Sequence, residues 1–330
     1  MRIGLIGAGQ FGRKHLETIR NEPRCELAGV ADPAWQGEKR YADYREMLDR
    51  AKPDGVIIAT PNALHVPAGL ACIERAVPIL VEKPIADTVA ASNELVTAAQ
   101  RAGVALLVGH HRRHNPILEK AREIVQGGGI GRLTAAAALW LLQKPADYFD
   151  VAWRREPGGG PLLINAIHDI DDLRFVCGEI DEVRALVSNT TRGFKVEDTA
   201  AIALRFANGA LGTLTVSDAV AAPWSWELAS GENPVYPRQE ASCYFFTGTQ
   251  GALSVPDMTL FSYAEKTGWT APLAKRTIEV AREDPQARQL RHFCRVIRGE
   301  EAPRIDGADA TRTLAVVEAI RNAAHDGSCR

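Results

Sequence analysis

The chain has 330 residues, of which 46% are hydrophobic and 24% charged, and its formal net charge is −2 at pH 7. This length is too great for one mid-sized core and predicts two domains. The nearly neutral charge gives no basis for binding nucleic acid or an anionic membrane. No apolar run reaches the roughly eighteen residues that a membrane helix needs, and the chain starts with a strand pattern rather than a secretory signal.

The six cysteines are scattered along the chain, without a CxxC and without metal-like spacing. Such usage is typical of reduced thiols in a cytoplasmic protein. We therefore expect a cytoplasmic location and no structural metal.

The N-terminal segment combines a strand pattern, a glycine motif and a helix pattern in the order of a dinucleotide site. Met1–Ile6 is a short apolar run, suited to a buried parallel strand. It continues into Gly7-Ala8-Gly9-Gln10-Phe11-Gly12, a GxGxxG, and then into Arg13–Arg20, which predicts a helix. In this motif the glycines provide a tight turn, close approach of backbone to a pyrophosphate, and close packing of helix on strand. The helix N-terminus offers free N–H groups to the phosphates.

Asp32 extends this pattern and indicates which dinucleotide is bound. It ends a second apolar run, Cys25–Ala31, and lies twenty residues after Gly12. Its carboxylate can accept hydrogen bonds from both hydroxyls of a ribose and would repel a 2′-phosphate. No arginine follows it directly, only Pro33-Ala34-Trp35. The sequence therefore predicts NAD rather than NADP.

Residues 1 to about 120 alternate strand and helix patterns. After the first two strands, strands are predicted at Asp54–Ala59, Pro78–Val81 and Val104–Val108, and helices at His65–Arg75, Thr88–Arg101 and Asn115–Gln126. This rhythm predicts an α/β domain with a doubly wound parallel sheet, a Rossmann domain, that binds ligands at the carboxyl ends of its strands.

Residues 121–330 show a different pattern, dominated by strands. Strands are predicted at Thr134–Leu142, Glu182–Asn189, Asp198–Phe206, Ala210–Ser217, Ser242–Thr247, Ala252–Val255, Thr259–Tyr263 and Thr277–Ala281. Helices are predicted at Leu162–Val176, Pro285–Arg298 and Gly307–Ala324, the last of which we expect to pack back on the first domain. Asn208-Gly209 predicts a type I′ hairpin.

The second domain is therefore expected to be α+β, with a large, mainly antiparallel, open sheet. Few helices are available to cover it, so one face of the sheet needs another partner. This predicts a homodimer or homotetramer formed through the open face.

Four segments with chemically active side chains accompany this organisation. Three of them follow predicted strands of the first domain: residues 59–65 (ATPNALH), 82–84 (EKP) and 109–116 (GHHRRHNP). The fourth, residues 158–171 (GGGPLLINAIHDID), opens a helix in the second domain. Together with the glycine motif they resemble the Gfo/Idh/MocA family (glucose–fructose oxidoreductase, inositol dehydrogenase, rhizopine catabolism) over the whole chain.

That resemblance implies an N-terminal domain that binds NAD(P) and a C-terminal domain that supplies the substrate site and the oligomer interface. Typical substrates of the family are sugars, cyclitols and their derivatives. It implies cofactor-binding roles for Gly7, Gly9, Gln10, Phe11, Gly12, Asp32, Thr60, Pro61, Asn62, His65, Glu82, Lys83 and Arg154. Substrate-binding roles are expected for Asn165, His110, Arg113, Asp172 and Trp153.

Two side chains are expected to carry the chemistry. Lys83 follows a buried strand, where a cation can stabilise the alkoxide that develops during hydride transfer. His168 lies on the helix opened by the glycines and can take a hydroxyl proton near neutral pH. Many family members carry an Asp four residues before this histidine, and this chain has Ile164 there. Asp172 and Asn165 are the alternative partners of His168.

The leading hypothesis is an NAD-dependent dehydrogenase that transfers a hydride between the nicotinamide and a secondary hydroxyl of a sugar, cyclitol or related polyol. One alternative is a reductase or dihydrodiol-type dehydrogenase that acts on a non-sugar. Another is a non-catalytic NAD(P)-sensing regulator of the same fold. Two local interpretations stay open: a metal held by His110 and His114 with an Asp, and a sugar-stacking or interface role for the loop 223–238.

Overall fold

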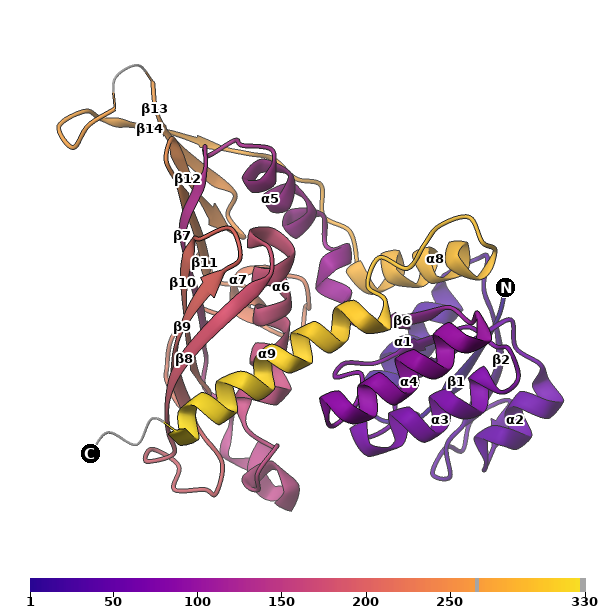
Figure 1. The fold of residues 1–330 in the computed structure, drawn as a ribbon. Coiled ribbons are helices and arrows are strands. Elements are labelled where there is room, and N and C mark those ends of the chain that lie inside the picture. Colours follow the sequence, from indigo (N-terminus) through magenta and orange to yellow (C-terminus); the bar gives the residue numbers. More distant parts are fainter. Residues whose placement is uncertain (265–266, 327–330) are drawn as a thin grey trace. The chain divides into compact units, whose positions relative to one another are not determined.

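The computed structural model describes residues 1–264 and 267–326, and the chain forms two compact units (Figure 1). Unit 1 consists of Met1–His114 and Asp284–Ala315. Unit 2 consists of Asn115–Glu283 and the segment that begins at Val316. No helix in the described part of the chain is long and apolar enough to span a membrane.

Unit 1 is built on a six-stranded sheet in the order β3-β2-β1-β4-β5-β6, in which every pair of neighbours is parallel. Its strands are β1 (Arg2–Ile6), β2 (Glu26–Ala31), β3 (Arg40–Tyr41), β4 (Gly55–Ile58), β5 (Ile79–Val81) and β6 (Leu106–Val108). Its helices include α1 (Gln10–Asn21), α2 (Tyr44–Ala51), α3 (His65–Ile73) and α4 (Val89–Ala102). This is the doubly wound order in which ligands bind where the strand order reverses, beside β1 and β4. The predicted Rossmann fold is confirmed.

Two elements of unit 1 were absent from the sequence prediction, β3 and α2. Asp43 caps α2 by accepting hydrogen bonds from the backbone N–H groups of Arg45 and Glu46. An acid at the cap followed by Glu46 three residues later resembles a capping box, a signal that would have indicated this helix.

Unit 1 also contains α8 (Pro285–Ile297), which comes from far along the chain. The α8 side chains Leu290, Phe293 and Cys294 join the apolar core that contains Ile3 and Leu16. The first turn of α9 (Gly307–Asp326) belongs here too, since a Cβ on Gly307 would lie 2.5 Å from a Leu106 methyl group. The unit boundaries therefore differ from the expected domains 1–120 and 121–330, because α8 buries its apolar face in the first core.

Unit 2 is built on an eight-stranded sheet in the order β14-β13-β12-β11-β7-β10-β9-β8. Its strands are β7 (Leu133–Leu141), β8 (Ile180–Ser188), β9 (Thr199–Phe206), β10 (Leu211–Ser217), β11 (Tyr244–Gly248), β12 (Gly251–Val255), β13 (Thr259–Tyr263) and β14 (Leu273–Thr277). Only β7 and β10 pair in parallel. The expected large, mainly antiparallel sheet is confirmed.

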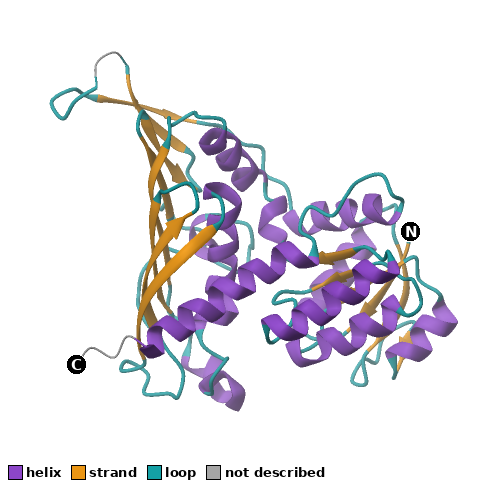
Figure 2. Ribbon diagram, viewed as in Figure 1, coloured by secondary structure: helices purple, strands orange, loops and turns teal. Residues whose placement is uncertain are grey.

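The helices of unit 2 lie along one face of this sheet (Figures 1 and 2). They are α5 (Pro116–Gln126), α6 (Ile167–Cys177), the short α7 (Trp226–Ala229) and the later part of α9. α6 is central, since every one of its side chains is buried.

Two local predictions for unit 2 were wrong. The last strand is β14, which ends at Thr277 opposite Thr259, where the expectation placed a strand at Thr277–Ala281. The β-branched pattern of the later segment was misleading, because beyond Ile278 the chain no longer pairs with β13. The hairpin at Asn208-Gly209 is not type I′, since Gly209 has a positive φ of 85° and Asn208 does not.

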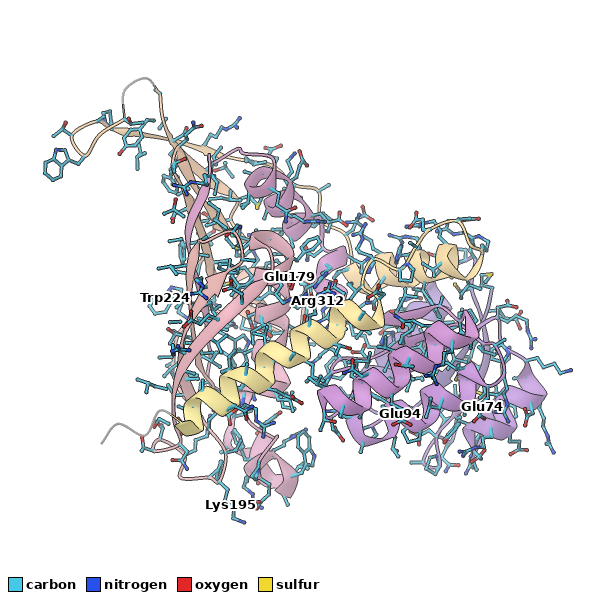
Figure 3. All side chains as sticks on the ribbon, viewed as in Figure 1. Glu74, Glu94, Glu179, Lys195, Trp224 and Arg312 are labelled. Atoms are coloured by element: carbon cyan, nitrogen blue, oxygen red, sulfur yellow. The ribbon has the colours of Figure 1, made fainter. Side chains whose placement is uncertain are left out.

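The other face of the sheet carries small and apolar side chains in register. Thr213 of β10 lies opposite Ala137 of β7 and Ala203 of β9, and Phe245 of β11 lies opposite Ala137. Ala203, Thr213 and Phe245 are exposed, and Leu211 is 60% exposed. Figure 3 shows the labelled Trp224, 45% exposed, beside the same sheet. This leaves a row of uncharged side chains across four strands without a covering helix.

Candidate active site

The glycine motif forms the turn between β1 and α1. Gly7 has a φ of +92°, and a Cβ there would lie 2.6 Å from the carbonyl oxygen of Ala59. A Cβ on Gly12 would lie 2.0 Å from the oxygen of Gly7, so the helix packs on the turn only with glycine at this position. Gly9 differs, because no described atom lies within 4 Å of its missing Cβ. Gly7 and Gly12 are therefore required by close packing, whereas Gly9 leaves open space above the turn.

The first turn of α1 presents its amides to that space. Gly9 is the N-cap, and among the described residues no side chain caps the helix and no acid stands in the first turn. Phe11, in the same turn, is 48% exposed. An uncapped helix start with glycine backbone before it suits an anionic group such as a pyrophosphate.

Asp32 lies at the end of β2, beside the glycine turn. Its Oδ2 accepts a hydrogen bond from the N–H of Ala8 at 2.7 Å, and its Oδ1 accepts one from the N–H of Ala34, also at 2.7 Å. Each oxygen keeps lone pairs for a further donor. The backbone thus holds the carboxylate in place while leaving it able to accept ribose hydroxyls.

Lys83 follows β5, and its neighbour Glu82 fixes the backbone there. Glu82 is buried, its Oε1 lies 2.6 Å from Nε2 of His15 on α1, and its Oε2 accepts the N–H of Lys83 at 3.1 Å. Burial alone would raise the pKa of Glu82, but the hydrogen bond and charge of His15, with His111 and Lys83 nearby, bring that pKa to about 2. Glu82 thus anchors the backbone of the loop that carries Lys83, and its expected cofactor-binding role stays a prediction. The Lys83 Nζ lies 5.8 Å from the centre of the Phe11 ring.

His65 is also held inside unit 1, and its expected cofactor-binding role stays a prediction. It is 1% exposed, with Nδ1 2.9 Å from the carbonyl oxygen of Pro84 and Nε2 3.0 Å from that of Thr60. Burial lowers the pKa of His65, against the opposing effect of these carbonyls. Its ring therefore lies between the loop after β4 and the loop that carries Lys83.

The loop after β4 contains side chains that can contact a ligand. Thr60 Oγ1 is buried and has no hydrogen-bond partner in the part of the chain that the structure describes. Pro61 is exposed and Asn62 half-buried, at the start of a short 3₁₀ turn. A buried hydroxyl without a partner points to a polar group that the protein itself does not supply.

The side chains that follow β6 are mostly buried, and the substrate roles expected for His110 and Arg113 stay predictions. His110 is 1% exposed, and Arg113 is 6% exposed with its guanidinium paired to Asp309 of α9. The Arg113 guanidinium is therefore already engaged by the half-buried carboxylate of Asp309. His114 is buried too, which lowers its pKa to about 2 together with the charges of Arg304, His292, Arg288 and His111. No three metal-ligating side chains are grouped anywhere among residues 1–264 and 267–326.

In unit 2, the glycine segment leads into α6 through one π-helical turn, Leu162–Ala166. π-Turns inside helices are rare and are frequently found at functional sites. His168 lies in the first turn of α6 and is 7% exposed. Asn165 is half-buried in the π-turn, and its Oδ1 is buried without a hydrogen-bond partner among the described residues. Ile164 stands where the family's usual Asp is expected, so the π-turn supplies no carboxylate.

Asp172, expected to bind substrate, lies in the interior of unit 2. It is 1% exposed, and its Oδ2 is 3.0 Å from the hydroxyl of Tyr244. The same hydroxyl lies 2.5 Å from Oδ1 of Asp169, which is fully buried. A tyrosine hydroxyl has one proton, so one carboxylate accepts it at a time. Asp169 and Tyr244 were missed by the sequence analysis, since nothing local connects residues so far apart in the chain.

Trp153 and Arg154 lie on a short 3₁₀ turn before the glycines. Trp153 is 51% exposed, available for a ligand contact. The Arg154 guanidinium stacks on the Tyr148 ring at 3.9 Å and donates to the Tyr148 carbonyl at 2.6 Å. Its Nε is buried without a hydrogen-bond partner within the described chain. Arg154 Nε is therefore a donor that a ligand could use, and its expected cofactor-binding role stays a prediction.

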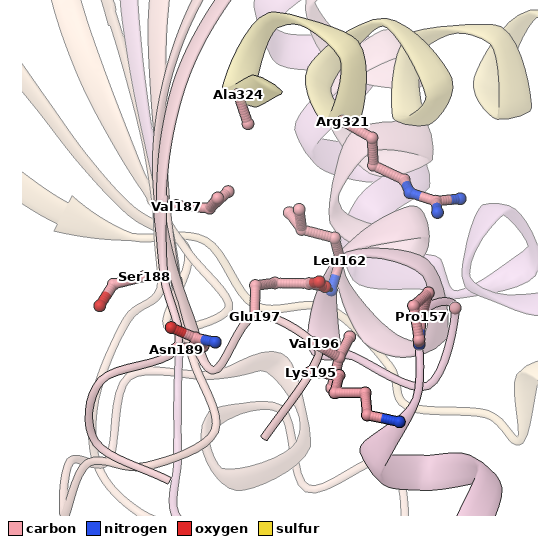
Figure 4. A pocket seen from close by; sticks show the side chains of 11 residues that line it. Pro157, Leu162, Val187, Ser188, Asn189, Lys195, Val196, Glu197, Arg321 and Ala324 are labelled. Atoms are coloured by element: carbon pink, nitrogen blue, oxygen red, sulfur yellow. Dashed lines mark hydrogen bonds between the residues drawn. The ribbon is translucent and has the colours of Figure 1, made fainter. Parts of the chain in front are cut away.

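Glu197 anchors the start of the same helix segment and was not anticipated. Its Oε1 accepts the N–H of Leu162 at 3.1 Å, and a Cβ on Gly160 would lie 2.3 Å from that oxygen. Burial raises the pKa of Glu197. It lines a cavity of about 310 Å³, shown in Figure 4, together with residues of the glycine segment, β8 and α9.

The loop 223–238 turns out to be partly core. Trp226 is 1% exposed, stacks on Tyr244 with ring centres 5.8 Å apart, and donates from Nε1 to Glu232 at 3.0 Å. A ring so enclosed offers no face to a sugar. Trp224 and Tyr236 are partly exposed.

Two family models match the chain and decide its relationship. Residues 1–110 match the model described as the oxidoreductase family with an NAD-binding Rossmann fold. Residues 118–254 match the GFO/IDH/MocA C-terminal domain. The chain belongs to the Gfo/Idh/MocA family. Its N-terminal part is accordingly an NAD-binding domain of an oxidoreductase family.

Curated family members are similar over part of their length. The rhizopine catabolism protein MocA of Rhizobium meliloti is 33% identical over 200 residues, which are 58% of this chain and 62% of that protein. Myo-inositol 2-dehydrogenase of Thermotoga maritima is 29% identical over 231 residues, or 65% of this chain and 67% of that enzyme. This chain thus matches about two thirds of the length of these Gfo/Idh/MocA relatives.

A solved structure extends the likeness of fold to the whole chain. The WlbA dehydrogenase from Bordetella pertussis, in complex with NADH and UDP-GlcNAcA, superposes with a TM-score of 0.78. The match covers 99% of this chain and 97% of WlbA at 24% identity. At this identity the comparison shows the Gfo/Idh/MocA fold.

The residues of unit 1 fit the family's cofactor. NAD would lie with its pyrophosphate above Gly9 at the uncapped start of α1, and with a ribose at Asp32. The unpartnered Thr60 Oγ1 is a further group for it. When bound, NAD supplies a nicotinamide that accepts or returns a hydride.

Asp32 is expected to make NAD bind more tightly than NADP. Asp32→Ala is expected to reduce this difference in affinity. The carboxylate accepts from ribose hydroxyls and repels a 2′-phosphate. Calorimetric titration with both dinucleotides measures this. Because Asp32 also holds the N–H groups of Ala8 and Ala34, Asp32→Asn serves as the less disruptive second variant. Equal or tighter binding of NADP by the unaltered chain would contradict the prediction.

Proposed function

We propose that this protein is an NAD-dependent dehydrogenase that transfers a hydride between the nicotinamide and a secondary hydroxyl of a sugar, cyclitol or related polyol. The main support is the backbone around Lys83, which the buried Glu82–His15 pair and His65 hold rigidly at the end of β5. A cation that is positioned before the reaction can stabilise negative charge as it develops in the transition state. Curated relatives such as inositol 2-dehydrogenases support the substrate class.

In this proposal Lys83 donates a hydrogen bond to the reacting oxygen and stabilises the negative charge that develops on it. His168 takes the hydroxyl proton, or returns it in the reverse direction. Asn165 and Arg154 orient the ligand through their buried, unpartnered Oδ1 and Nε atoms. Trp153 contributes an exposed ring for a sugar face.

A substrate screen tests the proposal. The protein with NAD is incubated with sugars, inositols and uronic acids, and NADH formation is followed by its absorbance, beside a thermal-shift measurement on each mixture. We expect turnover with at least one polyol. Ligand-induced stabilisation by sugars without any NADH formation would favour the NAD(P)-sensing regulator, and turnover confined to non-sugar substrates would favour the reductase or dihydrodiol-type alternative.

His168→Ala is expected to lower turnover by about tenfold to a hundredfold, less than removal of Lys83 does. The reason is that Ile164 deprives the imidazole of the carboxylate that usually raises its pKa and holds its tautomer. A double-mutant cycle with Asn165→Ala and Asp172→Asn shows which residue is coupled to His168. Unchanged turnover and an unchanged pH profile in His168→Ala would mean that the proton leaves by another route.

We further propose that the helix-free face of the unit 2 sheet joins copies of the chain into a homodimer or homotetramer, and that the protein is cytoplasmic. Thr213→Arg places a charge in the middle of the uncharged row. It is expected to lower the mass measured by light scattering to that of a single chain, since burying an unpaired charge is costly. Ala102→Arg, at the exposed end of α4, is the matched control. A monomeric unaltered protein would refute the interface.

A further inference from the structure

Two cysteines that are 269 positions apart in the sequence meet in the core of unit 1. Cys25 precedes β2 and Cys294 lies in α8, and their Sγ atoms are 3.3 Å apart. The five described cysteines are free thiols, and the other three lie buried elsewhere. The pair is therefore a specific contact between the N-terminal strand region and a C-terminal helix.

The surroundings hold the two sulfurs together. Cys294 is 4% exposed and shares an apolar core with Phe293, Leu290 and Leu27, against which Cys25 packs. Cys25 itself is partly exposed, so a small oxidant reaches the pair from its side. A disulfide needs sulfurs at about 2.05 Å, so closure by somewhat more than 1 Å completes the bond.

The electrostatics of the pair favour a thiolate on one sulfur. The hydrogen bond from Cys25 lowers the pKa of Cys294, and the positive charge of Arg298 acts in the same direction. The same hydrogen bond and burial raise the pKa of Cys25. Glu22 lies nearby with the opposite effect on Cys294, and it is itself paired with Arg24 and Arg291.

We propose that Cys25 and Cys294 form an oxidation site at which a hydroperoxide, such as hydrogen peroxide, converts the two thiols into a disulfide that staples α8 to β2. The Cys294 sulfur attacks one peroxide oxygen, an S–O bond forms and the O–O bond breaks, and the departing oxygen leaves as water. The Cys25 sulfur then attacks the sulfenic sulfur, the S–S bond forms, and the second oxygen leaves as water. Two thiols lose two electrons and two protons, and one peroxide becomes two waters.

The Cys25–Cys294 disulfide would close a loop that contains most of the chain. Cross-linking distant residues stabilises chiefly by restricting the unfolded chain, and more so for longer loops. Oxidation is therefore expected to raise the thermal unfolding midpoint by about 5 °C or more. Reduction with dithiothreitol is expected to reverse that rise.

A peptide map tests the site directly. The experiment uses the full chain carrying Cys329→Ser, so that this sixth thiol cannot react with peroxide or form other disulfides. After graded hydrogen peroxide, free thiols are alkylated and the protein is cleaved with trypsin without reduction. We expect a linked pair of peptides, 25–39 and 292–295, each containing a single cysteine, and a loss of two alkylatable thiols per chain.

Matched variants make the result specific. Cys25→Ser and Cys294→Ser are expected to lose both the linked peptides and the rise in midpoint, and Cys72→Ser, which alters a lone buried thiol, is expected to keep both. Circular dichroism before oxidation checks that each variant is folded. Peroxide that drives Cys25 to sulfinic or sulfonic acid without linked peptides would overturn the proposal. Linkage without any change in midpoint would overturn the stapling of α8 to β2.

Discussion

Lys83→Ala is expected to lower turnover by about a hundredfold or more while the affinity for NAD changes little. Removal of one preorganised donor from a developing oxyanion has an effect of this size. The Lys83 backbone N–H is held by the buried carboxylate of Glu82, and the Lys83 Nζ lies near the Phe11 ring of the glycine turn. Steady-state kinetics on the substrate found in the screen, with calorimetry for NAD, separates the two quantities.

The control for this prediction is Lys275→Ala, which removes an exposed lysine of β14 in unit 2 and should leave turnover unchanged. Lys83→Arg is the conservative variant; it keeps the charge but changes the geometry, and we expect only partial recovery. Near-normal turnover in Lys83→Ala would exclude Lys83 from catalysis. A large loss of NAD affinity with little change in turnover would instead make it a cofactor-binding residue.

Glu82→Gln is expected to lower the free energy of unfolding at pH 7 by about 3 kcal/mol. The carboxylate of Glu82 is buried against His15 and accepts the Lys83 N–H. Its pKa in the folded protein is about 2, against an ordinary 4.5. A lowered carboxyl pKa means that the unfolded chain binds more protons between these two values, so this stabilisation is complete above about pH 4.5 and is lost as pH falls toward 2.

Urea unfolding at a series of pH values, followed by circular dichroism, measures this effect. The unaltered protein should lose stability between pH 5 and 2, and Glu82→Gln should lose less over the same range because it has no carboxylate to protonate. Glu38→Gln is the matched control, since Glu38 forms an exposed pair with Arg20 and exposed pairs contribute little. Equal acid sensitivity of the Glu82→Gln and unaltered proteins would contradict the assignment.

Local sequence patterns predicted the structure correctly where the residues of a single segment determine its conformation. The strand, glycine turn, helix and acid of residues 1–32 follow from backbone geometry, and Gly7 and Gly12 are required by contacts that a Cβ would violate. The antiparallel sheet followed from alternating patterns, confirmed by side chains of β9 that are alternately exposed and buried. The last strand was predicted too far along the chain, because every residue of β14 is exposed and the strand therefore has no alternation of apolar and polar side chains.

The sequence by itself determined the family, the Rossmann unit, the glycine turn and the positions of Lys83 and His168, because each depends on residues close together in the chain. Only the tertiary structure decided that Arg113 pairs with Asp309, that Asp172 meets Tyr244, and that the His65 ring lies between two backbone carbonyls. It also decided that α8 completes the core of unit 1 and brings Cys294 to Cys25. Periodicity reports which face of a segment is buried, whereas the partner on that face comes from another part of the chain.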